Sequence, residues 1–273
     1  MPATAPLIEV KNLSVRFGDE LVLDDVSFEV HEEEVFVVLG ESGCGKTTLL
    51  RCMTGLLRPQ SGAVLIAGTD IHQVHGHART ELLRMFGVLF QSGALFKSMT
   101  LGENVALPLQ EATDLPSALV NELTRMRLAM VNLEGGENLM PSEMSGGMQK
   151  RGGLARAIAL DPRILFFDEP SAGLDPVTSV ELDELILGLN RSLGTTMVVV
   201  THELQSIFKI AQRAIMLDRE THRIIAEGTP EGMRDESPHP RVQAFFRRQR
   251  VPATVESLMP GGDSVNQHEA GDA

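Results

Sequence analysis

Residues 35–48, VFVVLGESGCGKTT, decide the fold of this chain. The apolar run Val35–Leu39 predicts a buried strand, and Gly40–Thr47 matches G-x-x-x-x-G-K-[ST], a pattern that joins a strand to a helix around a phosphate group. Glycines let successive backbone N–H groups turn inward around phosphates, and the following helix adds the partial positive charge of its N-terminus. The sequence therefore predicts a nucleoside triphosphate site.

The residues of this phosphate loop carry separate expectations. Lys46 should reach the β- and γ-phosphates, and the hydroxyl of Thr47 should coordinate Mg²⁺. We expect the side chain of Glu41 to face away from the nucleotide. The motif alone does not choose among kinases, GTPases and ATPases. The residues expected to contact the nucleotide here are Gly40, Glu41, Ser42, Gly43, Cys44, Gly45, Lys46, Thr47 and Thr48.

The composition limits the class of protein. A chain of 273 residues with 42% hydrophobic residues can form one large domain, or one domain with a subdomain and a tail. Its net charge of −13 argues against a nucleic-acid-binding protein, which would carry a basic surface. No run approaches the roughly 18 apolar residues of a membrane span, and the N-terminus lacks the pattern of a secretory signal. We therefore expect a cytosolic protein.

The two cysteines, Cys44 and Cys52, indicate a reducing compartment rather than a disulfide framework. Because Cys44 lies in the phosphate loop next to a helix N-terminus, we expect the pKa of its thiol to be lowered. Alkylation of this thiol should then abolish turnover, and a bound nucleotide should protect it.

Strand and helix patterns alternate along most of the chain. Helical spacing dominates from Thr100 to about Leu160, and the alternation of strands and helices resumes after that stretch. Such alternation calls for a parallel sheet covered by helices, and hence an α/β fold. The expected strands are Ile8–Val15, Val22–Val30, Val35–Leu39, Gly62–Gly68, Gly87–Phe90, Ile164–Phe167, Met197–Val200 and Ala214–Leu217. The expected helices include Lys46–Leu57, Glu181–Leu193 and Leu204–Ala211.

A second motif places two acids at the end of a predicted strand. The apolar run Ile164–Phe167 is followed directly by Asp168 and Glu169. A carboxylate at the end of a buried strand beside the phosphate loop can hold the Mg²⁺ shell, which we expect of Asp168. Glu169 projects differently because it comes one residue later, and we expect it to polarise the attacking water as a general base. The pair favours hydrolysis over binding alone.

A glycine-rich motif before these acids identifies a family. Met144-Ser145-Gly146-Gly147-Met148 resembles the LSGGQ signature of ABC ATPases, and it precedes the two acids as the family order requires. The resemblance implies that Ser145, Gly146 and Gly147 contact the γ-phosphate of ATP held by a second copy of the chain. It therefore also implies a homodimer that binds ATP between its subunits.

Further residues fit the same resemblance. Gln91 follows a predicted strand and resembles the Q-loop glutamine, Ser171–Asp175 resembles the D-loop, and His202 resembles the switch histidine that contacts the γ-phosphate. Phe17 stands where an aromatic ring stacks on adenine, although an ordinary core phenylalanine is the alternative. The implied cofactors are ATP and Mg²⁺. The metal ligands would be Thr47, Gln91 and Asp168, and the catalytic residues would be Glu169, His202 and Lys46.

The resemblance also implies a domain organisation. Residues 8–228 correspond to an ABC ATPase domain, a P-loop NTPase core with an N-terminal antiparallel β subdomain and a helical insertion at about 92–160. Residues 229–251 form a C-terminal extension, and we expect residues 252–273 to be disordered. Gly152 and Gly153 fall inside the helix expected after the signature. Either they permit close packing or that helix is locally weak.

Three segments indicate a subfamily. Residues 87–96, GVLFQSGALF, and residues 103–109, ENVALPL, resemble the ATPases of Mla-type systems, and so does the tail segment 238–246. These ATPases work with an integral membrane permease and a periplasmic MCE-domain protein to move phospholipids between the inner and outer membranes. The resemblance implies a peripheral position on the cytoplasmic face of the inner membrane. It also leaves room for a small cytoplasmic accessory subunit.

Two alternatives stay open. The ATPase of a small-solute importer would share the same chemistry with a different permease. A soluble ABC protein acting on DNA or ribosomes would carry a long coiled-coil insertion or a second ATPase cassette, and this acidic sequence has neither.

Overall fold

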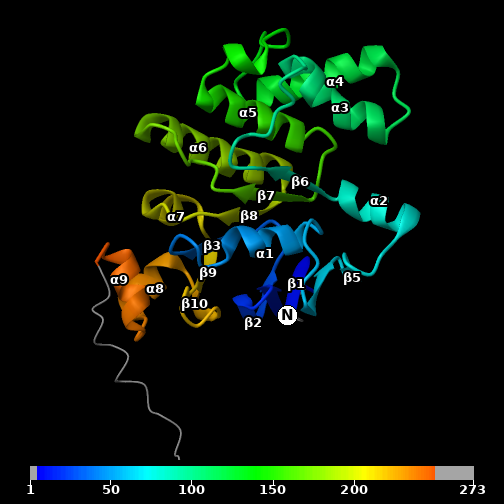
Figure 1. Cartoon of the computed structure of the whole chain (residues 1–273). Coiled ribbons are helices and arrows are strands. Elements are labelled where there is room, and N and C mark those ends of the chain that lie inside the picture. The colour runs from blue at the N-terminus through cyan, green and yellow to red at the C-terminus, as the bar shows by residue number, and fades with distance from the viewer. Residues whose placement is uncertain (1–4, 250–273) are drawn as a thin grey trace, which may run out of the picture.

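The computed structural model describes residues 5–249 and contains two sheets with helices packed against them (Figure 1). The larger sheet has the strand order β10-β9-β3-β8-β7-β6, and its neighbouring strands are parallel except for β9 with β10. Its strands are β3 (Val35–Gly40), β6 (Phe86–Leu89), β7 (Ile164–Asp168), β8 (Thr196–Val200), β9 (Arg213–Leu217) and β10 (Ile224–Gly228). Because the carboxyl ends of parallel strands meet at one edge, the segments that follow β3, β8 and β7 lie side by side.

The smaller sheet is antiparallel, with the order β2-β1-β4-β5. Its strands are β1 (Ile8–Phe17), β2 (Glu20–Val30), β4 (Ser61–Ile66) and β5 (Thr69–Asp70). Helix α1 (Lys46–Met53) follows the phosphate loop and shares one buried cluster with residues of both sheets. The ring of Phe28 in β2 stacks on Phe36 in β3, with centroids 5.3 Å apart, and so joins the two sheets directly.

The strand β3 is buried on both faces, as its uninterrupted apolar run predicts. Val37 and Leu39 belong to the cluster that includes the helices of the second half of the chain. Phe36 and Val38 point the other way, into the cluster shared with α1 and the antiparallel sheet. The strand that leads into the phosphate loop is therefore held rigidly from both sides.

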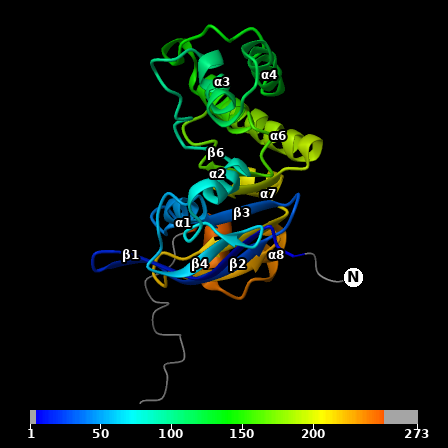
Figure 2. The same ribbon diagram turned by 90° about the vertical axis from the view of Figure 1, so that its right-hand side faces the viewer.

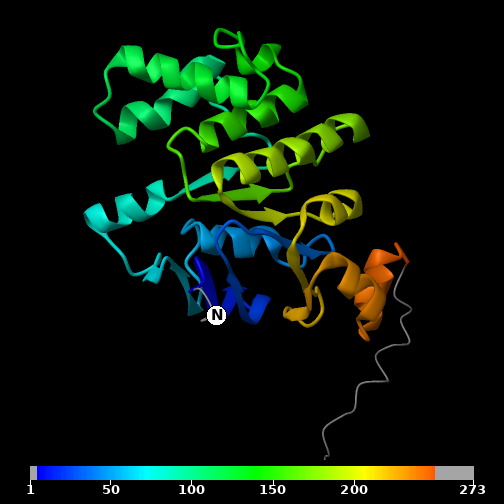
Figure 3. The ribbon, with the colours of Figure 1, turned by 180° about the vertical axis from the view of Figure 1, so that it is seen from behind.

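Helices α3 (Leu101–Ala112), α4 (Ser117–Met130) and α5 (Gly146–Ala157) gather at one end of the molecule, beyond the large sheet (Figures 1 and 3). Figure 2 shows the antiparallel sheet, the large sheet and these helices one above the other. The predicted α/β fold, with an antiparallel sheet and a helical insertion, is confirmed. Among residues 5–249, every helix is too short or too polar to span a membrane.

The remaining helices are α2 (Gly76–Arg84), the 3-10 turn η1 (Pro141–Glu143), α6 (Pro176–Leu193), α7 (Leu204–Ile210), α8 (Pro230–Glu236) and α9 (Pro240–Phe246).

Two helix predictions need correction. The helix predicted over Glu181–Leu193 begins earlier, at Pro176, because the side chain of Asp175 accepts from the N–H groups of Val177 and Thr178 and so caps it. The helix predicted over Lys46–Leu57 ends at Met53, because Gly55 adopts a φ of 71°, which belongs to the left-handed region and stops the helix. Helix α2 was not predicted, because its sequence is mostly polar and Leu82 is its only buried residue. Residues 252–273, which we expect to be disordered, lie outside the described part of the chain.

The glycine pair in α5 serves close packing. A Cβ atom on Gly152 would lie 2.7 Å from Cδ1 of Leu101 in α3. A Cβ atom on Gly153 would lie 2.6 Å from the carbonyl oxygen of Gly93 and 2.9 Å from Cδ1 of Leu89 in β6. Of the two explanations that the sequence leaves open, close packing is therefore the one that the structure supports.

Replacing Gly153 by Ala should lower the free energy of unfolding by about 1–3 kcal/mol, because the added methyl group overpacks α5 against its neighbours. Gly188 is the matched control. It lies inside α6, and a Cβ atom there would meet nothing within 4 Å, so Gly188→Ala should raise the unfolding free energy by up to about 1 kcal/mol. Urea unfolding followed by circular dichroism measures both variants. Equal changes in the two would contradict the packing argument.

Candidate nucleotide site

The phosphate loop has the open backbone that its glycines predict. Gly40, Gly43 and Gly45 have φ angles of 148°, 82° and 101°, which favour glycine. Gly45 caps α1, and no side chain of the described residues caps the first N–H groups of this helix. These N–H groups are therefore free to bind an anion at the helix N-terminus.

Lys46 lies buried across the base of this loop. Its Nζ donates hydrogen bonds to the carbonyl oxygens of Gly40 and Glu41, at 2.9 and 3.0 Å. It also lies 3.8 Å from Oε1 of Glu169. The ammonium group is thus held where the open N–H groups of the loop and a carboxylate converge.

Thr47 and Asp168 meet although they are far apart in the sequence. Oγ1 of Thr47 donates a hydrogen bond of 2.9 Å to Oδ1 of Asp168 at the end of β7. Burial raises the pKa of the Asp168 carboxyl, although the bond from Thr47 opposes that shift. A hydroxyl and a carboxylate oxygen are the ligands that Mg²⁺ prefers, so the residues fit this metal. The third predicted ligand, Gln91, is exposed, and no hydrogen bond joins it to either residue in the described structure.

Glu169 and His202 also meet. Their strands, β7 and β8, are adjacent, and the backbone N–H of Glu169 donates to the carbonyl oxygen of Val200 at 2.9 Å. Nδ1 of His202 lies 2.9 Å from each carboxylate oxygen of Glu169. Glu169 has a φ of 47°, an uncommon value for a residue other than glycine. The carboxylate therefore stands between an imidazole and the lysine of the phosphate loop.

The signature residues start a helix and do not join their own phosphate loop. Ser145 caps α5, and its Oγ accepts a hydrogen bond of 3.2 Å from the backbone N–H of Met148. Gly146 is exposed, and a Cβ atom on Gly147 would lie 2.7 Å from Cγ2 of Thr178 in α6. Among residues 5–249, no hydrogen bond or ion pair links this turn to residues 40–48. Within the described residues, the N–H groups of Gly146 and Gly147 have no hydrogen-bond partner, so this helix N-terminus is open to an anion.

Phe17 is not an ordinary core residue. It is the last residue of β1, and 51% of its surface is exposed. An aromatic ring left in solvent at a strand end is available for stacking. Its contact with adenine stays a prediction.

Two buried residues that the sequence does not single out support this site. Lys150 of α5 is buried, and its Nζ donates to the carbonyl oxygen of Glu169 at 3.2 Å. Asn104 of α3 is fully buried, and it accepts from the backbone N–H of Phe96 and donates to the carbonyl oxygens of Phe96, Met99 and Thr100. The first holds the backbone of the expected base, and the second fixes the segment that follows Gln91. A polar residue inside a helix carries no sequence signal of its burial.

The expectation for Cys44 is wrong. Its side chain is 1% exposed, and burial raises the pKa of the thiol, although the neighbouring Lys46 lowers it. Desolvation of a thiolate at this depth outweighs the helix N-terminus. Cys52 is also buried, and burial raises the pKa of its thiol to about 12.

We therefore expect both thiols to resist alkylation in the folded protein. A raised pKa lowers the thiolate fraction at pH 8, so iodoacetamide should leave the native chain unmodified over a time in which it modifies both cysteines in urea. Mass spectrometry counts the adducts. Rapid modification of native Cys44 that ATP prevents would contradict the structure and restore the expectation from the sequence.

Comparisons with known proteins agree with this geometry. The family described as ABC transporter matches residues 23–172. The intermembrane phospholipid transport system ATP-binding protein MlaF of Haemophilus influenzae is 43% identical over 225 residues, which cover 82% of this chain and 84% of that protein. The probable ribonucleotide transport ATP-binding protein mkl of Mycobacterium leprae is 41% identical over 244 residues, which cover 89% of this chain and 70% of that protein.

A solved structure agrees as well. A dimeric ATP-binding cassette in a post-hydrolysis state, bound to ADP and Pi, matches with a TM-score of 0.74 and 30% identity, covering 81% of this chain and 98% of that one. The ABC ATPase type of fold that the signature motif implies is confirmed. The chain therefore belongs to the ABC transporter family, as one of its ATP-binding proteins.

Proposed function

We propose that this chain hydrolyses ATP to energise phospholipid transport between the inner and outer membranes, as a subunit of an ABC transporter. The observation that carries the ATPase activity is the position of the Glu169 carboxylate, 2.9 Å from Nδ1 of His202 and 3.8 Å from Nζ of Lys46. A carboxylate held there can take a proton from a water molecule beside a bound phosphate. The phospholipid cargo is supported by 40–43% identity to proteins named MlaF.

The residues divide the work of hydrolysis between them. Lys46 exchanges the carbonyl oxygens of its own loop for phosphate oxygens, and the N–H groups of the loop complete the cradle. Thr47 and Asp168 would hold Mg²⁺, joined by Gln91, and the ion supplies positive charge that offsets the phosphates. Glu169 accepts the proton of the attacking water. His202 keeps that carboxylate oriented and contacts the γ-phosphate.

We further propose that two copies enclose two ATP molecules. In each half, the phosphate loop of one copy would face Ser145, Gly146 and Gly147 of the other, while Phe17 stacks on adenine. The support is that, in the described structure, the signature turn makes no hydrogen bond to the loop of its own chain and leaves N–H groups open. A dimer is also the form in which the matching cassette was solved.

The helical insertion offers a docking site for the permease. We assign residues 8–228 to the ATPase domain, 92–160 to its helical subdomain and 229–251 to an extension. A groove of about 420 Å³ between α3 and α4 is lined by residues that include Glu103, Gln110 and Arg125. Oγ1 of Thr124, which also lines it, is buried and has no hydrogen-bond partner in the described structure. These groups suit a polar helix of a membrane protein.

The partners are tested by purification of the tagged full-length chain from membranes in mild detergent. We expect mass spectrometry to find an integral permease, an MCE-domain protein and phospholipid, with a small cytoplasmic accessory subunit as a further component. This result would place the chain at the cytoplasmic face of the inner membrane. Recovery of a different permease would be consistent with the ATPase activity but would contradict the phospholipid cargo. No membrane partner at all would overturn the transport function.

The second candidate is a transporter of small solutes. It is favoured by the 41% identity to a protein named as a probable ribonucleotide transport subunit. The purified complex in vesicles separates the two candidates. Stimulation of ATP hydrolysis by a ribonucleotide and not by phospholipid would favour the second.

A further inference from the structure

Asp183 and Ser206 form a buried polar pair between helices α6 and α7. They are 2% and 3% exposed, and Oγ of Ser206 donates a hydrogen bond of 2.9 Å to Oδ2 of Asp183. The other carboxylate oxygen, Oδ1, is buried and has no hydrogen-bond partner in the described structure. Nothing in the nucleotide site uses this acid.

Stability does not account for a carboxyl group at this position. Burial raises the pKa of Asp183 to about 6, against smaller opposing effects from Ser206 and Lys209, while Glu203 and Glu184 raise it further. The folded pKa exceeds the ordinary value, so the stability linked to this group is fully present below about pH 4 and is lost as the pH rises through about 6. At neutral pH an apolar side chain of similar size would stabilise the fold more.

The two helices lead directly to the residues expected to act in hydrolysis. Helix α6 begins after the loop that starts at Glu169, and α7 begins just after His202. The pairing of β7 with β8 brings His202 beside Glu169, and α7 fixes the chain on the other side of His202, whose Nδ1 lies 2.9 Å from the Glu169 carboxylate.

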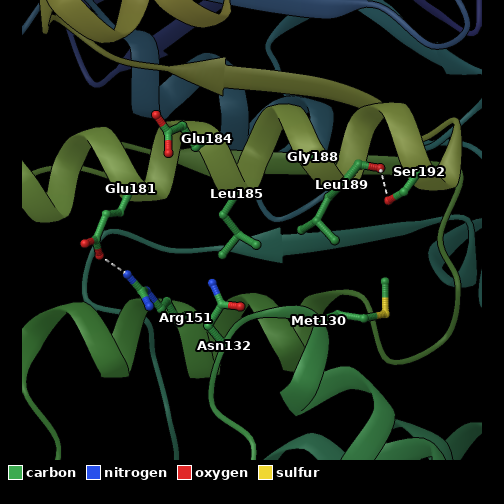
Figure 4. Close-up of a pocket in the computed structure, with 9 residues that line it drawn as sticks. All are labelled: Met130, Asn132, Arg151, Glu181, Glu184, Leu185, Gly188, Leu189 and Ser192. Atoms are coloured by element: carbon green, nitrogen blue, oxygen red, sulfur yellow. Dashed lines mark hydrogen bonds and ion pairs between the residues drawn. The ribbon is translucent and has the colours of Figure 1, made fainter.

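Helix α6 is also joined to helix α5 by an ion pair. Arg151 of α5 pairs with Glu181 at the edge of a cavity of about 660 Å³ between α6 and the end of α4 (Figure 4). Two further hydrogen bonds join α7 to α6, and both come from Lys209 of α7. Its Nζ donates to the carbonyl oxygen of Val180 at 3.0 Å and to Oε1 of Glu184 at 3.2 Å. Those bonds lie at the exposed surface. Among the described residues, the Asp183–Ser206 bond is the buried hydrogen bond between two helices that otherwise meet through apolar side chains.

We propose that Asp183 is a positioning residue for hydrolysis, which holds α7 through Ser206 and thereby keeps His202 on the Glu169 carboxylate. This role rests on the proposed ATPase function. It requires an acceptor at position 183 and a donor at position 206. It does not require the negative charge.

The test compares variants of the full-length chain by steady-state ATP hydrolysis. Ser206→Ala and Asp183→Val remove the bond, and each should lower kcat about 5- to 10-fold, the fold-change that loss of one hydrogen bond produces, with KM for ATP within about twofold. Asp183→Asn keeps an acceptor and should retain kcat within about twofold. Lys209→Met removes the exposed tie and is the matched control, also within about twofold. The double variant Asp183→Val/Ser206→Ala should be no slower than either single variant.

A readout that needs no turnover separates positioning from general damage. The imidazole ¹⁵N signals of His202 should shift in Ser206→Ala and stay at their wild-type positions in Asp183→Asn. Unchanged kcat and unchanged His202 signals in Ser206→Ala would overturn the proposal, and so would a loss in Asp183→Asn as large as in Asp183→Val. If the wild-type chain bound ATP without hydrolysing it, the proposed ATPase function would fail, while the His202 signals would still decide the positioning role.

Discussion

Replacing Glu169 by Gln should lower kcat for ATP hydrolysis by about 10² to 10⁴, while ATP binding persists. Glutamine fills the same space but cannot accept a proton, so the water beside the γ-phosphate loses its base. The carboxylate now contacts His202 at 2.9 Å and approaches Lys46 at 3.8 Å. Phosphate release at steady state and nucleotide binding by fluorescence measure the two effects separately.

Glu203→Gln is the matched control for this prediction. Glu203 lies one residue after His202, and its side chain makes no hydrogen bond in the described structure. The kcat of this variant should stay within about twofold of the wild type, since within residues 5–249 no hydrogen bond or ion pair joins the Glu203 side chain to Lys46 or to His202. If the Glu169 variant hydrolysed ATP as fast as this control, Glu169 would not be the general base.

The second large effect is expected for Lys46→Met. Charged hydrogen bonds to phosphate contribute about 1.5–3 kcal/mol each, so the loss of one such contact should weaken ATP binding by about 10- to 100-fold. The variant also removes the donor that serves the carbonyl oxygens of Gly40 and Glu41. Hydrolysis should fall with binding, in contrast to Glu169→Gln.

Calorimetric titration with ATP in the presence of Mg²⁺ measures this effect. Lys11→Met, on the exposed side of β1, is the control and should bind ATP as the wild type does. If the Lys46 variant bound ATP with unchanged affinity, the phosphate loop would not be part of the nucleotide site.

The parts of the fold that depend on local sequence were predictable. The strand, loop and helix around residues 35–48 follow from an apolar run, three glycines and a helix start, which act within a few residues of one another. The end of α1 could not be predicted in this way, since it depends on the backbone conformation of Gly55 rather than on the apolar pattern.

The contacts of the site depend on strand order, which no short motif encodes. His202 meets Glu169 because β8 lies beside β7, and Thr47 meets Asp168 because only β8 separates β3 from β7. The family resemblance supplied these residues, and the structure brings them together. The roles of Gln91 and Ser145 stay predictions, because within residues 5–249 neither makes a hydrogen bond to the phosphate loop of its own chain.

Burial is the other quantity that the sequence did not supply. Cys44 lies next to a helix N-terminus as predicted, yet its depth raises the pKa of the thiol instead of lowering it. Lys150 and Asp183 were overlooked because a charged residue within a helix is usually exposed. Phe17 shows the reverse, since an aromatic residue that could have belonged to the core is half exposed.

The most direct test of the account is the molar mass of the Glu169→Gln variant with and without ATP and Mg²⁺, measured by light scattering during size-exclusion chromatography. The account predicts the chain mass of 29.7 kDa without nucleotide and about twice that mass with it, because each signature turn completes the site of the other copy. Exchange of Ser145 for Arg in the same background should abolish the ATP-dependent dimer. A variant that binds ATP and keeps the mass of a single chain would contradict the account.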